Sequence, residues 1–293
     1  MTQSEPLLPA TSAAYSHKRG RAWRLRPCLR ALFVGTWLGA LQVACAGGSG
    51  NAPGAQDPVR MSESEYDIAR DLWLNRGQLR EALEHALKAA ELDPENAEAV
   101  HLVALLYLDF CARSPGECRL KEAERHARRA IELRPDFREA QNTLGVILIH
   151  EQRYRDAIAV LVPLSQDILY PTPEKAWGNL GWAYLEAGQI ASAVEALRRS
   201  IAAQPLFCVG SFRLGLAYER KGDLAAALEA LTRALETEAP ECSRLQDALA
   251  ARARVAARLG RSEDARVDLA RCAELSSATE TGKNCRSMLD KLK

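Results

Sequence analysis

Apolar side chains recur along the chain with helical spacing, most clearly in residues 174–207. Within this segment, positions i, i+3, i+4 and i+7 form one stripe, made of Trp177, Leu180, Gly181 and Tyr184. This spacing predicts one face of an α-helix. After a short turn comes a second stripe of small and apolar residues: Ala193, Leu197 and Ser200. Pro205 ends the second helix, because proline lacks a backbone donor and crowds the preceding turn. The segment therefore predicts a helical hairpin.

The same pattern accounts for most of the chain at a period near 34 residues. A unit of this length with W-x2-L-G-x2-Y on its first helix is typical of the tetratricopeptide repeat (TPR). The predicted repeats are 63–96, 97–137, 138–173, 174–207, 208–245 and 246–281, followed by a C-terminal capping helix at 282–293. We therefore predict an all-α fold, a right-handed superhelical solenoid of six helix-turn-helix repeats. Each hairpin would bury its apolar stripe only against its neighbours.

The N-terminal region has the features of an export signal. A basic stretch ends at Arg30 and is followed by the uncharged segment Ala31–Ala44, then by Cys45. As a helix this segment would be about 21 Å long, shorter than the roughly 30 Å of a bilayer core. We therefore predict a signal peptide at 1–44, followed by Cys45 within a flexible linker at 45–62.

The residues up to Cys45 resemble a bacterial lipobox, which implies diacylation of the Cys45 thiol. Gln42 departs from the usual pattern, in which a large apolar residue stands three places before the cysteine. Cleavage after Ala46 without lipidation and an uncleaved anchor are the alternatives. A cytosolic scaffold with a misassigned start is a further possibility, and it would have free thiols.

Charge and motifs argue against several functions. The chain has a net charge of +1, but residues 1–44 contain six basic residues against Glu5 alone, so the remainder is acidic overall. This gives no support to nucleic-acid binding. The sequence has no H-E-x-x-H, G-x-S-x-G, phosphate-binding or dinucleotide motif. We predict a protein that is not an enzyme and has neither cofactor nor metal.

Six cysteines follow Cys45, and an even number in an exported protein suggests disulfides. We predict pairing of Cys111 with Cys118, across an insertion in repeat two, and of Cys272 with Cys285, between the last repeat and the capping helix. For Cys208 and Cys242, which begin successive repeats, the separation leaves a disulfide and two free thiols equally open. The alternative for all six is that they are small buried apolar side chains.

Resemblance to TPR proteins implies a concave wall built from the first helix of each repeat. The residues assigned to this predicted groove are Asn142, Val146, Ile149, Lys175, Trp182, Leu185, Phe212, Leu216 and Arg220. Trp182 is not needed by the packing motif, so it is either a binding hot spot or a contact with a neighbouring first helix. Val146 stands where the carboxylate clamp of cytosolic co-chaperones needs asparagine, which argues against that function.

Three stretches carry a more specific resemblance: residues 114–151, 167–188 and 202–222. Together with the lipobox-like Cys45, they are similar to the TPR pilotins of type IV pili, the family of PilF, PilW and Tgl, and most of all to Tgl of gliding bacteria. The resemblance implies a lipoprotein of the outer membrane, anchored by acyl chains. It would bind the PilQ-like secretin and promote its insertion and multimerisation. The alternative is a generic periplasmic TPR lipoprotein that serves as an adaptor for envelope or cell-wall enzymes.

Overall fold

The computed structural model describes residues 57–291, and in this range the chain is entirely helical. The predicted signal peptide, Cys45 and most of the predicted linker lie outside the described residues. None of the described helices is long and apolar enough to cross a membrane. The α-helices are α1 (Pro58–Leu74), α2 (Leu79–Leu92), α3 (Ala97–Arg113), α4 (Leu120–Leu133), α5 (Arg138–His150), α6 (Tyr154–Gln166), α7 (Pro173–Glu186), α8 (Ile190–Ala203), α9 (Cys208–Lys221), α10 (Leu224–Glu236), α11 (Gln246–Arg258), α12 (Ser262–Leu275) and α13 (Glu280–Lys291), with short 3-10 helices η1 (Pro115–Glu117) and η2 (Cys242–Arg244).

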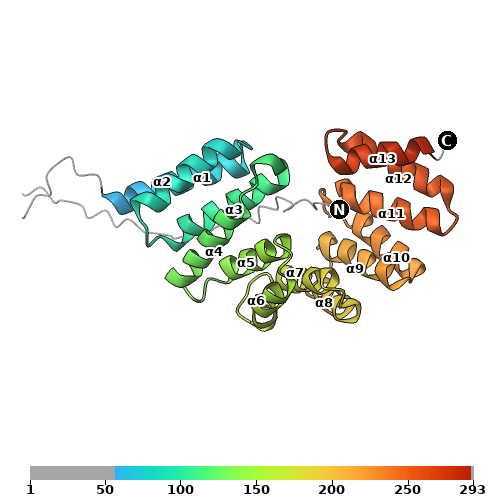
Figure 1. Cartoon of the computed structure of the whole chain (residues 1–293), viewed down its shortest axis with the longest axis horizontal. Helices are drawn as coiled ribbons and strands as arrows, with labels where there is room; N and C mark the ends of the chain where they lie inside the picture. Colours follow the sequence, from blue (N-terminus) through green and yellow to red (C-terminus); the bar gives the residue numbers. More distant parts are fainter. Residues whose placement is uncertain (1–56, 292–293) are drawn as a thin grey trace, which may run out of the picture.

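The helices form successive hairpins stacked into a curved solenoid (Figure 1). Odd-numbered helices from α3 to α11 lie toward the inside of the arc, and their even-numbered partners lie outside. The two ends of the stack, α1–α2 and α12–α13, lie far apart along the molecule. This arrangement confirms the predicted all-α TPR solenoid. The inner helices line the concave side of the arc, where a bound polypeptide would contact several repeats at once.

The glycine of the repeat signature is explained by the contact inside each hairpin. A Cβ atom added to Gly145, Gly181 or Gly215 would lie only 2.5–2.6 Å from the side chain of a leucine on the second helix. These leucines are Leu161, Leu197 and Leu231, all fully buried. Glycine costs a helix about 1 kcal/mol relative to alanine. Close approach of the two helices requires it nonetheless, because the leucine occupies the space of the missing methyl group.

Two predicted boundaries differ from the structure. The first helix begins at Pro58, so residues 58–62 are helical although we placed them in the linker. The side chain of Asp57 accepts a hydrogen bond from the Val59 amide, and Ser62 is buried, donating to the carbonyl of Ala89. Likewise α3 continues to Arg113, so the first residues after Cys111, which we placed in the insertion of repeat two, are helical. The repeat pattern marks the packing positions of a helix and does not specify where its cap lies.

Three disulfides join the six described cysteines in pairs. Cys111–Cys118 closes the connection between α3 and α4, and Cys272–Cys285 joins α12 to α13. Cys208–Cys242 joins the start of α9 to η2, with the Cα atoms 5.8 Å apart. The last pair thus joins the start of repeat five to the connection that leads into repeat six, a pairing that the sequence left open.

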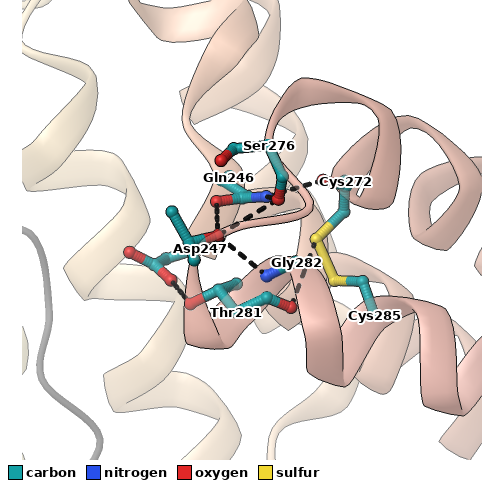
Figure 2. Close-up of a disulfide and its surroundings, with 8 residues drawn as sticks. Gln246, Asp247, Cys272, Ser276, Thr281, Gly282 and Cys285 are labelled. Carbon is teal, nitrogen blue, oxygen red and sulfur yellow. Dashed lines mark hydrogen bonds between the residues drawn. A yellow bond between two sulfur atoms is a disulfide. The ribbon is translucent and has the colours of Figure 1, made fainter.

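The capping helix α13 is fixed to the last repeat by more than its disulfide (Figure 2). The amide of Gln246 donates to the carbonyls of Cys272 and Ser276, and Thr281 donates its hydroxyl to the Asp247 carboxylate at 2.6 Å. A Cβ atom on Gly282 would lie 1.8 Å from the Ser276 carbonyl oxygen. The backbone of α13 therefore packs directly against the backbone of the preceding loop, and only glycine fits there. The cap therefore covers the apolar end of the solenoid, which would otherwise face water.

Candidate protein-binding surface

The predicted groove residues do not form one open surface. Five of the nine are buried: Val146, Ile149, Trp182, Leu185 and Phe212. Their side chains belong to the apolar cores that join neighbouring repeats. These residues therefore hold the wall together and are not exposed on it, which corrects their assignment as partner contacts.

Trp182 shows how the wall is built. Its side chain is only 7 % exposed. The His150 ring from α5 meets the indole edge-on at 5.0 Å, and the Arg213 guanidinium from α9 lies 4.4 Å from the ring centroid. The tryptophan thus fills the contact between three successive first helices. The hot-spot interpretation of Trp182 is wrong, and the alternative, packing against neighbouring first helices, describes the structure.

A chain of side-chain hydrogen bonds runs beside this contact. The amide of Asn179 donates to the side-chain oxygen of Asn142 at 2.9 Å, and Arg213 donates to the side-chain oxygen of Asn179 at 2.8 Å. Each bond joins the first helix of one repeat to that of the next. Buried polar groups need such partners, and the network fixes the repeats in register. Asn142 is therefore engaged inside the protein.

Charged side chains at the other end of the first helices are also paired between repeats. Arg220 donates to the Leu185 carbonyl at 2.7 Å and to the Glu186 carboxylate at 2.8 Å. One repeat further on, Arg254 makes two hydrogen bonds to Glu219, each 2.8 Å long. Burial opposes ionisation of Glu219, yet these bonds leave its pKa below the usual value. Four predicted groove residues are therefore not buried, namely Asn142, Lys175, Leu216 and Arg220. Two of them, Asn142 and Arg220, are hydrogen-bonded to a neighbouring first helix.

Two histidines of the inner helices are held neutral. Burial lowers the pKa of His101 to about 3, assisted by the charge of Arg134, and His101 hydrogen-bonds to Thr143 at 2.8 Å. Burial, with the charge of Arg213, lowers the pKa of His150 to about 4. An unfolded histidine has a pKa near 6.5. The stabilisation from keeping both rings neutral is therefore complete above about pH 6.5 and is lost as the pH falls toward the folded values.

We accordingly expect the urea midpoint to fall when the pH is lowered from about 7.5 to about 5, where ordinary carboxylates are still ionised. The double variant His101→Asn with His150→Asn should show a smaller fall over the same range, whatever its midpoint at neutral pH. Urea titrations followed by circular dichroism measure both. A wild-type midpoint that is unchanged across this range would contradict the assignment.

The described residues contain no group of three or more His, Cys, Asp or Glu side chains placed to hold a metal ion. Several of their charged side chains form ion pairs between helices, such as Arg252 with Asp268.

Comparison with known proteins agrees with this architecture. The profile of the tetratricopeptide repeat family matches residues 119–161, 178–241 and 212–277. The chain therefore carries tetratricopeptide repeats in residues 119–161 and 178–277. Such scaffolds present surfaces to other polypeptides, and their stability is distributed over neighbouring repeats.

Among curated relatives, this TPR protein is 31 % identical over 155 residues to "Type IV pilus assembly protein PilF" of Pseudomonas aeruginosa. That match covers 50 % of this chain and 58 % of the relative. The chain therefore aligns with little more than half the length of this relative.

Solved structures share the fold. The crystal structure of "PilW, widely conserved type IV pilus biogenesis factor" has a TM-score of 0.62 at 23 % identity, covering 76 % of this chain and 97 % of that one. Pseudomonas aeruginosa PilF has a TM-score of 0.58 at 18 % identity, covering 80 % and 100 %. A TPR protein from Parabacteroides merdae has a TM-score of 0.62 at 15 % identity, covering 79 % and 84 %. At these identities the likeness concerns the fold alone.

Proposed function

We propose that this TPR protein is a pilotin of type IV pili. In this proposal it is anchored in the outer membrane through an acylated Cys45, binds the pilus secretin, and promotes secretin insertion and multimerisation. The observation that carries the proposal is the 31 % identity to a type IV pilus assembly protein over half of the chain. Acyl chains on the N-terminal cysteine would supply the membrane attachment, since two or more chains anchor a protein stably.

One feature of the described residues supports an envelope location. Three disulfides join all six cysteines between residues 57 and 291. Disulfides persist in oxidising compartments such as the periplasm and are rare in the bacterial cytosol. This argues against a cytosolic scaffold with free thiols.

The proposed contact surface on the inner wall is smaller than the sequence indicated. It keeps Lys175, Leu216 and Arg220, three of the four predicted groove residues that are not buried; the fourth, Asn142, is hydrogen-bonded to Asn179. Of these, Leu216 offers apolar area, and Lys175 offers a charge. The buried aromatic residues would support this surface from behind.

A deletion strain tests the proposal. We expect SDS-resistant secretin multimers to be lost on deletion and restored by the wild-type gene. Complementation with Lys175→Ala plus Leu216→Ala should restore fewer multimers if the inner wall binds the secretin. The matched control is the exposed outer-face pair Arg125→Ala with Arg129→Ala on α4, which should restore multimers fully. Unchanged multimers in the deletion strain would reject the pilotin function and favour a general envelope adaptor.

A further inference from the structure

Two successive connections between hairpins expose large aliphatic side chains. Between α6 and α7, Ile168 is 95 % exposed and Leu169 is 69 % exposed; between α8 and α9, Leu206 is 56 % exposed. Because the hairpins stack in register, connections of the same kind lie along one edge of a solenoid. We call these three residues the aliphatic edge.

Both connections are held in place by contacts with the helices beneath them. In the first, the Asp167 carboxylate accepts the Leu169 amide at 2.8 Å and the Arg138 guanidinium at 2.6 Å, while Tyr170 is buried. In the second, a Cβ atom on Gly178 would lie 3.1 Å from the Phe207 ring, so this ring packs directly on α7. The exposed side chains are therefore displayed by fixed turns. A preorganised surface loses less conformational entropy when it binds a partner.

Packing does not require aliphatic residues at these positions. Leu169 and Leu206 each stand directly before an aromatic anchor, Tyr170 and Phe207. In the preceding repeat the residue directly before Phe137 is the exposed Asp136. The fold thus accepts a charged side chain at this place. Leaving leucine in water forgoes the free energy that burial would supply, and a group of exposed apolar side chains marks an interaction site.

The charges along this edge identify the kind of partner. Residues 202–210, which contain Leu206, carry no charged side chain. The connection at 93–98 has three acidic residues and no basic one, and that at 236–244 has three glutamates and one arginine. The connection between α4 and α5 adds Asp136 and Arg134, and Arg134 is paired with Glu98. Near the aliphatic edge, Arg138 is already paired with Asp167, and Lys175 follows Glu174 in the first turn of α7. An apolar centre between acidic ends favours an apolar segment with basic flanks and repels an anionic lipid surface.

We propose that the aliphatic edge binds an apolar, helix-forming segment of another protein whose ends carry lysine or arginine. The surface is separate from the inner wall, and the argument uses neither the pilus relatives nor the lipid anchor. It therefore stands or falls independently of the pilotin function.

A labelled amphipathic helix of leucine and lysine serves as the probe, and the same peptide with glutamate in place of every lysine serves as the charge control. Binding of the labelled peptide to the purified full chain is measured by fluorescence anisotropy, with the peptide alone as the blank. We expect the triple variant Ile168→Ser, Leu169→Ser, Leu206→Ser to bind the lysine peptide about tenfold more weakly than the wild type. The wild type should bind the glutamate peptide more weakly by a similar factor.

The matched control is Leu259→Ser with Val267→Ser, which removes exposed aliphatic side chains outside the edge. It should bind the lysine peptide like the wild type, and circular dichroism should show that both variants remain helical. Equal binding by the triple variant, or equally tight binding of the glutamate peptide, would overturn the proposal. Edge-dependent binding to vesicles of phosphatidylcholine and phosphatidylglycerol that exceeds peptide binding would also overturn it, because the occupant would then be a membrane.

Discussion

Replacing Trp182 with alanine is expected to lower the free energy of unfolding by about 3–5 kcal/mol, the usual cost of removing a large buried aromatic side chain. The indole fills the contact between α5, α7 and α9, touching His150 and Arg213. Its loss would open a cavity between three consecutive repeats. It would also remove the aromatic ring that the Arg213 guanidinium packs against. Urea unfolding followed by circular dichroism measures the change.

The appropriate control for Trp182→Ala is Leu206→Ala, which shortens an exposed side chain. It should change stability by less than about 0.5 kcal/mol, as is typical of surface substitutions. A Trp182→Ala variant as stable as Leu206→Ala would show that the tryptophan is not a packing residue. The result also bears on partner binding. Any loss of secretin multimers in a Trp182→Ala strain has to be compared with the amount of folded protein before it is attributed to a lost contact.

Removing the Cys208–Cys242 disulfide by a double substitution to serine is expected to cost about 4 kcal/mol. The bond joins residues 34 positions apart, and the entropy that a cross-link removes from the unfolded chain grows with the length of the closed loop. The bond also holds the connection that leads into repeat six against α9, so without it the end of the solenoid would open more readily. Urea unfolding of the oxidised proteins gives the difference.

The pair Cys111–Cys118 provides the comparison, because its residues are only 7 positions apart. Its replacement by two serines should cost about 2.5 kcal/mol on the same reasoning. Equal losses for the two double variants would contradict the loop-length argument. If neither substitution changed stability, the disulfides would contribute nothing to the fold.

Contacts within a hairpin could be predicted from the sequence because they repeat with it. Gly181 and Leu197 belong to the two stripes of a single unit, and the structure brings them together as the spacing indicated. The same pair recurs as Gly145 with Leu161 and as Gly215 with Leu231. A contact between helices joined by a short turn depends on few geometric variables, so residue spacing is sufficient to identify it.

Contacts between hairpins could not be predicted in the same way. The position of Trp182 on its helix was correctly identified, but not the fact that α5 and α9 cover it from both sides. The aliphatic edge was also missed as a surface. A signal for it was present, since Leu206 directly follows Pro205, and Ile168 and Leu169 shortly precede Pro171. Exposure itself, however, depends on how each turn is anchored.

The sequence by itself determined the repeat, the all-helical class and the order of the hairpins, because a 34-residue period of apolar and small positions is satisfied by stacked helical pairs. Only the tertiary structure decided which inner residues are buried, that Cys208 reaches Cys242, and which aliphatic side chains remain in water. These properties depend on the angle and distance between successive hairpins, which arise from many side chains packing at once and which no single unit of the sequence specifies.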